Sequence, residues 1–279
     1  MVSDYQPLAG KVALVTGGSR GIGAGITRKL AAWGATICIN YVDRSGPAKA
    51  LAAQLEEQGT QVTLHRADLS DPESIERLMD GIGALHDDLH ILVHNAGATA
   101  FSTLEDATLA QWQFVQDTNS RSTWLLAKHA LPLMRERDGA RYITITNSTT
   151  TRIIQRAGLF AAAKAGMEAL TEYLSYELAP YGIVANCVRP GLVQTAVLDV
   201  RPDFAHGVRH EQAVSPWQDG QTTTVENTAD VVAMLCQPEA SWIAGQTITV
   251  DGGYRLWGGL SRTSAPAARA GQLDGVQGV

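Results

Sequence analysis

A glycine-rich segment near the start of the chain has the residue types and the spacing to bind a phosphate group. It reads Thr16-Gly-Gly-Ser-Arg-Gly-Ile-Gly23 and follows an apolar, strand-like run. Its glycines permit a tight turn and let a pyrophosphate approach the backbone, while the N-terminus of the next helix supplies N–H donors and partial positive charge. In this strand–turn–helix context the pattern predicts a dinucleotide site. The predicted cofactor-binding residues of the turn are Gly17, Ser19, Arg20, Gly21, Ile22 and Gly23.

The residues after the second predicted strand indicate which dinucleotide binds. A site for NAD carries an acidic residue there for the ribose 2′-hydroxyl, whereas a site for NADP needs a cation. Arg20, from the glycine turn, and Arg44, from this segment, would form charge-assisted hydrogen bonds with a 2′-phosphate. Asp43 argues against this assignment, and both arginines could simply be solvated, but we predict NADP(H) as the cofactor. The residues concerned are Asn40, Tyr41, Arg44 and Ser45.

Alternating strand and helix patterns must position these residues. Seven short runs rich in Val and Ile are typical of parallel strands covered on both faces, and they span residues 11–18, 35–41, 61–69, 90–97, 140–147, 182–191 and 246–253. Helical patterns lie between them, at residues 23–33, 47–58, 72–82, 109–137, 159–179 and 228–236. Strict alternation predicts an α/β protein with a three-layer Rossmann fold and a doubly wound, seven-stranded parallel sheet.

The pattern predicts one domain followed by a tail. Residues 1–257 form the Rossmann domain, and residues 258–279 have the composition of an irregular C-terminal tail. Residues 191–226 follow the sixth strand, lack a regular pattern and are interpreted as a substrate lid, because loops after the carboxyl ends of strands cover the ligand crevice.

Composition excludes several other classes of protein. The 279 residues carry a net charge of −6 without a basic run, so nucleic acid is not an expected partner. No apolar stretch approaches the ~18 residues of a membrane span, and the N-terminus does not resemble a secretory signal. Three separated cysteines predict neither a disulfide nor a metal site. We expect a cytoplasmic protein acting on a small molecule.

Further motifs resemble those of the short-chain dehydrogenase/reductase family from Gly10 to about Tyr254. They are TGGSRGIG at 16–23, ADL at 67–69, NAG at 95–97, Asn119, Lys164 in AAAKAG, the Pro-Gly pair after the sixth strand, and VDGG at 250–253. Among relatives, acyl-carrier-protein reductases look most similar. The resemblance implies a nicotinamide laid across the carboxyl ends of the strands, in a homodimer or homotetramer. It also implies cofactor contacts from Asp68, Leu69, Asn95, Ala96, Gly97, Lys164, Pro190, Gly191, Val193 and Thr195.

The catalytic set implied by the resemblance is Asn, Ser, Tyr and Lys, and this chain matches only part of it. Asn119 and Lys164 are in place, but the position four residues before Lys164 holds Phe160. A variant with longer spacing points to Ala157. The serine is ambiguous as well: the family spacing falls on Asn147, and Ser148 comes one residue later.

The loss of a phenol changes the expected chemistry. Hydride addition to a carbonyl creates an alkoxide, and general acid catalysis of its protonation contributes roughly 10²–10⁴-fold. Hydride transfer itself belongs to the cofactor, so the reaction is slowed in principle and not forbidden. The proton could come from Ser148, from the hydroxyls of residues 149–151, from a water held by Lys164 and Asn119, or from His206 or His210.

Three interpretations remain open. The first is an NADPH-dependent reductase of a carbonyl or conjugated C=C bond in a medium-sized hydrophobic substrate, polyketide-like or acyl-linked. In the enone case the Asn147 amide could bind an enolate oxygen. The second is a non-redox cyclase, isomerase or dehydratase that keeps the dinucleotide as a scaffold. The third is a silent NADP(H)-binding protein. The intact cofactor residues favour the first. Arg152 and Arg156, expected at the pocket entrance, either meet an anionic substrate such as a carrier phosphate or are solvated.

Overall fold

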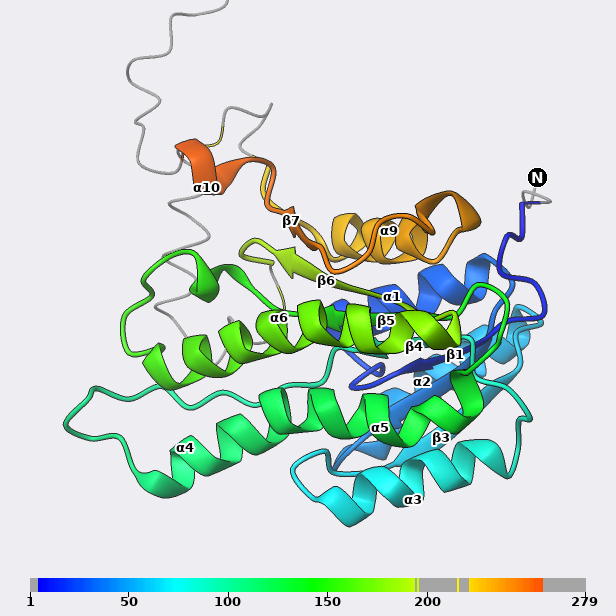
Figure 1. Cartoon of the computed structure of the whole chain (residues 1–279), viewed down its shortest axis with the longest axis horizontal. Helices are drawn as coiled ribbons and strands as arrows, with labels where there is room; N and C mark the ends of the chain where they lie inside the picture. The colour runs from blue at the N-terminus through cyan, green and yellow to red at the C-terminus, as the bar shows by residue number, and fades with distance from the viewer. Residues whose placement is uncertain (1–4, 194, 196–214, 216–220, 258–279) are drawn as a thin grey trace, which may run out of the picture.

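A seven-stranded parallel sheet forms the centre of the molecule. The computed structural model describes residues 5–193, 195, 215 and 221–257. The strand order is β3-β2-β1-β4-β5-β6-β7, and helices cover both faces of the sheet (Figure 1), which confirms the predicted doubly wound α/β fold. The strands are β1 (Val12–Val15), β2 (Thr36–Tyr41), β3 (Val62–Arg66), β4 (Ile91–His94), β5 (Arg141–Ile145), β6 (Val184–Pro190) and β7 (Thr247–Val250). The order reverses between β1 and β4, and in such sheets ligands bind outside the carboxyl ends at this reversal.

The helices α1 to α9 lie in the predicted segments with shifted ends, and α10 was not predicted. They are α1 (Gly21–Ala32), α2 (Ser45–Glu57), α3 (Pro72–Gly83), α4 (Leu109–Gln116), α5 (Ser122–Met134), α6 (Gly158–Leu178), α9 (Val225–Leu235) and α10 (Tyr254–Trp257). The helix predicted to start at residue 228 begins earlier because Thr224 and Asn227 form a reciprocal capping box at its N-terminus.

The prediction of one continuous helix over residues 109–137 is wrong. A π-helical turn, η1 (Asp117–Arg121), separates α4 from α5. Inside this turn the Asn119 amide donates to the carbonyls of Ala98 and Val115, at 2.8 Å each. Because one of these acceptors lies outside the helix, tertiary contacts accompany the change of helical pitch. Such turns are frequent at functional sites.

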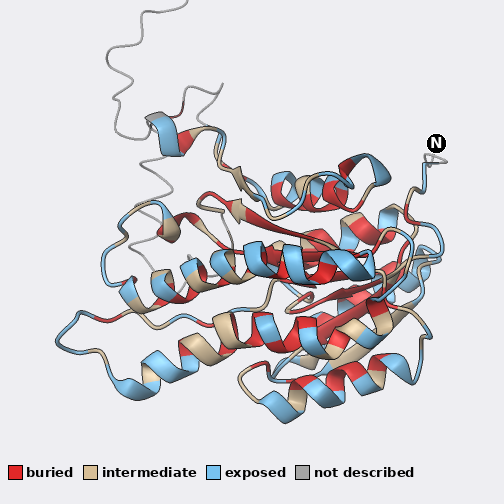
Figure 2. Cartoon of the chain, viewed as in Figure 1, coloured by how far each residue is buried: buried red, intermediate tan, exposed pale blue. Residues whose placement is uncertain are grey.

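Two apolar clusters hold the layers together, one on each face of the sheet. Figure 2 shows the buried residues concentrated on the strands and on the helix faces that meet them. The predicted burial of Cys38 and Cys187 is confirmed, and Cys236 is buried too. Burial raises the pKa of the Cys38 thiol to about 11, so it has little thiolate at neutral pH. Among the described helices, none has the length and apolar character needed to span a membrane.

Most of the predicted lid and all of the predicted tail lie outside the described residues. Of the lid, residues 191–193, 195, 215 and 221–226 are described. The candidate proton donors His206 and His210 belong to the part that is not.

Candidate functional site

The glycine turn between β1 and α1 leaves room for a ligand at its backbone. Gly17 and Gly21 have φ values of 59° and 53°, a region that L side chains rarely adopt. A Cβ atom on Gly23 would lie 2.2 Å from the Gly17 carbonyl oxygen and 2.5 Å from Asn95 Nδ2. No larger residue fits there without moving the turn. The first turn of α1 also carries no acidic residue, so its N–H groups can meet an anion. This cradle fits the pyrophosphate of a dinucleotide.

Two neighbouring strands fix the turn by hydrogen bonds. The Thr16 hydroxyl accepts from the N–H groups of Asn95 and Ala96, at 3.0 Å each. The Asn95 amide donates in return to the carbonyls of Thr16 and Gly17, at 3.0 and 3.2 Å. The β4 end is thereby attached to the turn, which brings together two motifs that the sequence separates by more than seventy residues.

Asn40 supports the turn from the other side. Its Oδ1 accepts from the Gly17 N–H at 3.2 Å, and its Nδ2 donates to the Ala67 carbonyl at 3.1 Å. The side chain is fully buried. Its polar atoms are therefore engaged within the protein, and its structural task is to join the ends of β1, β2 and β3. The predicted direct contact of Asn40 with a cofactor is not needed to explain its position.

Cationic side chains surround the end of β2. Arg20 and Arg44 are exposed and immediately precede α1 and α2, and within the described part of the chain no carboxylate pairs with either. Sequence analysis missed a third cation, Arg66 at the end of β3. Its Nε donates to the Val42 carbonyl at 2.9 Å. The register that pairs Tyr41 with Arg66 reveals this proximity. Asp43 is exposed, and Tyr41 and Ser45 are partly buried in the same segment.

The remaining predicted cofactor residues lie along the carboxyl edge of the sheet. At the β3 end, the Asp68 carboxylate accepts from the N–H and the hydroxyl of Ser70, at 2.8 Å each, and Leu69 is buried. The segment after β6 approaches the glycine turn, since Thr195 Cγ2 is 3.6 Å from the position of a Cβ on Gly21. Ser19, Ile22 and Val193 are partly buried, and Pro190 and Gly191 are buried beside β7.

Asn119 and Lys164 converge on Gly97. A Cβ atom on Gly97 would lie 2.7 Å from Asn119 Oδ1 and 3.2 Å from Lys164 Nζ. Asn119 is fully buried, and its Oδ1 has no hydrogen-bond partner among the described residues. A buried acceptor without a partner is costly, so this atom is suited to a bound water or a ligand hydroxyl. The lack of a side chain at Gly97 thus lets the two polar groups approach its backbone closely.

The protonation of Lys164 is set by burial. Its Nζ donates to the Ile145 carbonyl at 2.9 Å. Removal from water lowers the pKa of Lys164 to about 8, although Cys187 and the Glu168 carboxylate act in the opposite direction. The ammonium therefore exchanges a proton near neutral pH, which suits a group that relays protons.

His94, which sequence analysis did not single out, is fully buried at the end of β4. Its ring nitrogens face the hydroxyls of Ser122 and Thr123, at 3.1 Å each. Burial, assisted by the charge of Lys164, lowers the pKa of His94 to about 3. The imidazole is neutral at physiological pH and does not act as an acid. The sequence signal that could have identified His94 is its position at the end of a predicted strand, directly before Asn95.

Asn147 and Ser148 offer different groups. Asn147 Oδ1 accepts from the Thr149 N–H at 3.0 Å and so caps a short turn, η2 (Ser148–Thr150). Within the described chain the Ser148 hydroxyl makes no hydrogen bond. The turn is attached to α6 through Glu168, which accepts from the Thr150 hydroxyl at 2.9 Å. The geometry thus keeps Ser148 and the Asn147 NH₂ group available to a ligand.

Phe160 packs in an apolar cluster beside Lys164. The ring centroids of Phe160 and Phe101 are 6.1 Å apart, and Lys164 Nζ is 5.7 Å from the centroid of the Phe160 ring. The side chain is 8% exposed and also packs with Val115 and Ala163. The ring can shape the site and interact with the ammonium, but it has no proton to give.

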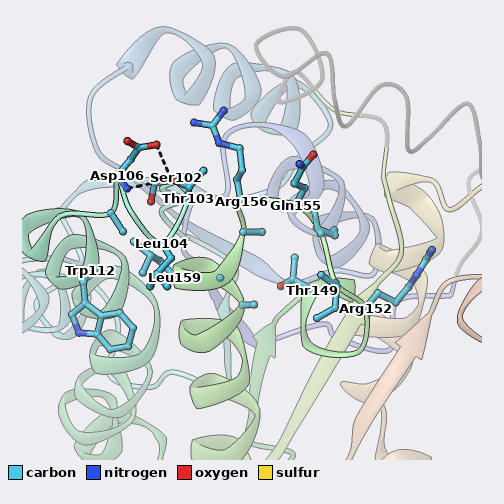
Figure 3. Close-up of a pocket in the computed structure, with 16 residues that line it drawn as sticks. Ser102, Thr103, Leu104, Asp106, Trp112, Thr149, Arg152, Gln155, Arg156 and Leu159 are labelled. Atoms are coloured by element: carbon cyan, nitrogen blue, oxygen red, sulfur yellow. Dashed lines mark hydrogen bonds between the residues drawn. The ribbon is translucent and has the colours of Figure 1, made fainter.

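A cavity of about 740 Å³ adjoins these residues. It lies between residues 102–107 with Trp112 and residues 149–161 (Figure 3). Its lining residues are Ser102, Thr103, Leu104, Asp106, Ala107, Trp112, Thr149, Arg152, Ile153, Ile154, Gln155, Arg156, Ala157, Gly158, Leu159 and Ala161. Arg152 and Arg156, which were expected at the entrance of the substrate pocket, both line this cavity. Cavities of this size hold typical small ligands.

Known proteins resemble the chain over most of its length. A family profile described as Enoyl-(Acyl carrier protein) reductase matches residues 17–255. The NADPH-dependent aldehyde reductase-like protein of Arabidopsis thaliana chloroplasts is 31% identical over 89% of this chain and 95% of that protein. The 3-oxoacyl-[acyl-carrier-protein] reductase of Escherichia coli is 34% identical over 88% of this chain and 98% of that protein.

A solved structure agrees with these relatives. A short-chain dehydrogenase from Burkholderia cenocepacia, in complex with NADP, superposes with a TM-score of 0.80 at 33% identity, over 88% of this chain and 98% of that one. The glycine cradle, the strand order and the extent of these matches lead to one conclusion: the chain belongs to the short-chain dehydrogenase/reductase family.

Proposed function

We propose that this protein is an NADPH-dependent reductase of a carbonyl or a conjugated C=C bond, whose proton does not come from a tyrosine. The family consists of oxidoreductases, and the glycine cradle and the cations at the end of β2 suit NADP(H). When bound, the cofactor supplies the hydride. Gly17, Gly21 and Gly23 would hold its pyrophosphate, and Arg20 and Arg44 its 2′-phosphate.

The observation that carries the proposal is the pair of polar atoms at Gly97. Asn119 Oδ1 is buried without a described hydrogen-bond partner, and both it and Lys164 Nζ approach the position that a Cβ on Gly97 would take. A water bound between them would satisfy the Asn119 acceptor. We infer that a water held by Lys164 and Asn119 delivers the proton, with Ser148 as the donor nearest the substrate. Phe160 stands where the family places a tyrosine, so the phenol step is replaced by this route.

The substrate class follows from the walls of the site. Phe101, Phe160 and the large side chains of the cavity favour a medium-sized hydrophobic molecule, polyketide-like or acyl-linked. One similar protein is named as a reductase of acyl-carrier-protein substrates. An enone or quinone-like substrate would delocalise charge after hydride addition, so a weaker acid than a phenol suffices, and the Asn147 NH₂ group would stabilise the enolate oxygen.

The experiment is NADPH oxidation, followed at 340 nm, across matched panels of simple ketones, enones and quinones. Turnover of at least one panel supports the reductase. Tight binding of NADPH without turnover of any member would favour a silent binder. Conversion of a test substrate without net NADPH oxidation would favour a non-redox enzyme. Either of the last two results would overturn the proposal.

We also propose that the protein is a homodimer or homotetramer that acts in the cytoplasm. Large aromatic side chains lie exposed on the helices that cover one face of the sheet, namely Phe114, Trp124, Tyr173 and Tyr176. Burial of such rings between subunits is favourable. Light scattering of the purified chain would measure the mass, and a monomer at micromolar concentration would contradict this part.

A further inference from the structure

The cavity of Figure 3 has an apolar side formed by large aliphatic and aromatic residues. Leu104 is 98% exposed and Ile153 is 100% exposed, although both are large aliphatic residues on its rim. Trp112 and Leu159 add further apolar surface to the wall. Side chains of this kind are stabilised when a ligand covers them. The apolar side thus favours a ring or an alkyl chain.

The polar side of the cavity has an excess of positive charge. Two guanidinium groups line it, those of Arg152 and Arg156, against one carboxylate, that of Asp106. Arg152 lies over the Tyr254 ring at 4.1 Å, and Asp106 accepts from the Thr103 hydroxyl at 2.6 Å. Within the described residues, no carboxylate pairs with Arg156. Arg156 is therefore the cation available to a ligand.

The backbone fixes Arg156 at the junction of the two walls. Its φ is 66°, an uncommon value for a residue with a side chain, and its carbonyl accepts from the Ser102 N–H at 3.0 Å. Such conformations persist where the surroundings hold them, and they cluster at ligand-binding segments. The Ser102 hydroxyl in this wall is buried without a described hydrogen-bond partner, and α6 begins here with no acidic residue in its first turn. The unpartnered hydroxyl and the N–H groups of the first turn of α6 are donors that favour a ligand with anionic oxygens.

The cavity is connected to the reacting centre through neighbouring residues. Leu159 and Ala161 line it on either side of Phe160, and Ser102 follows Phe101, whose ring packs on Phe160. Thr149 lines it directly after Ser148. A molecule whose reactive group lies near Ser148 could therefore extend into this cavity.

We propose that the cavity binds the end of the substrate remote from the reacting bond, and that this end is an apolar ring or chain bearing an anion, a carboxylate or a phosphate. This inference deepens the proposed function and rests on it. Arg156 is the specificity-determining residue, and Trp112 contributes to the apolar contact.

The test is calorimetric binding to the full chain saturated with NADP⁺, so that it requires no turnover. The probes are 1-naphthaleneacetate, 1-naphthyl phosphate and the neutral 1-naphthaleneethanol. At least one anion should bind about tenfold more tightly than the alcohol, the size expected for one charge-assisted hydrogen bond. The relative affinity of the two anions identifies the charged group.

Variants assign the effect to residues. Arg156→Gln should abolish the preference for anions while Arg156→Lys retains most of it. Arg28→Gln, an exposed arginine on α1 away from the cavity, should change nothing. Trp112→Ala should weaken all three probes about equally.

Failure of this inference is separable from failure of the proposed function. Equal affinity for the anions and the alcohol, unchanged preference in Arg156→Gln, or no binding of any probe would overturn the cavity assignment even if NADPH oxidation is observed. Anion-selective binding without NADPH oxidation would overturn only the reductase.

Discussion

The two halves of the site use different kinds of interaction. The cofactor half, around Gly17, is held by partly buried hydrogen bonds from Thr16, Asn40 and Asn95, and its shape depends on residues without side chains. The acid–base half consists of Asn119 on the π-helical turn and of side chains from Asn147 to Lys164 on a loop and a helix, with the Ser148 hydroxyl and Asn119 Oδ1 unengaged among the described residues. The glycines of the cofactor half leave little space for larger residues, whereas the acid–base half can replace a proton donor without a change in its backbone. That contrast is compatible with the proposed combination of an unchanged cofactor site and a proton source other than a tyrosine.

The largest effect should follow from closing the cofactor half. Gly23→Val places side-chain atoms against the Gly17 carbonyl and the Asn95 amide, so NADPH binding, measured by fluorescence titration, should be lost. Gly46→Ala is the matched control, because a Cβ there meets nothing within 4 Å. Retained NADPH affinity in a folded Gly23→Val protein, checked by circular dichroism, would mean that the cradle is not the phosphate site.

The next effect concerns Lys164, where the two halves meet. Lys164→Met should lower kcat by about 10²–10⁴-fold, the usual contribution of acid–base catalysis. In the unsubstituted protein the rate of reduction should fall as pH rises through about 8, because the ammonium then loses its proton. The variant should lack this pH dependence. Lys49→Met, on the exposed side of α2, serves as control, and an identical pH profile in Lys164→Met would contradict the role.

Restoring a phenol tests whether only the acid–base half departs from the family. Phe160→Tyr should raise the rate on simple ketones by up to about 10²-fold, since the remaining groups are in place. Phe101→Tyr adds the same hydroxyl to the partner ring of the same cluster and should not do so. If both variants leave ketone reduction unchanged, the proton route does not pass through this ring position.

The smallest effect should separate the two forms of the cofactor. Arg44→Ala removes one charge-assisted contact to a 2′-phosphate and should weaken NADPH about tenfold while leaving NADH unchanged. Arg66→Ala should act in the same direction, because Arg66 lies beside the same segment. Equal weakening of both nucleotides would point to a general loss of structure instead.

The sequence predicted the strands and the glycine turn better than the contacts among their residues. Apolar runs and the glycine spacing are local signals, so the strands and the turn at residues 16–23 were found. The role of Asn40 in the fold was not, because its partners lie at the ends of two other strands, β1 and β3. Arg66 required the register between β2 and β3, and the cavity required two loops to meet through the Ser102–Arg156 hydrogen bond.

The π-helical turn at Asp117–Arg121 has a consequence for how the site is encoded. An α-helix advances by about 100° per residue, so a turn wound more widely shifts the phase of everything after it. The direction of the Asn119 side chain relative to α4 and the apolar face of α5 are therefore coupled through the number of residues between them. Deleting one residue of this turn other than Asn119 would keep Asn119 and the sequences of α4 and α5. It would still rotate the two helices relative to each other and misdirect the side chains of one of them. Chain length at this point is as much a part of the site as the asparagine itself.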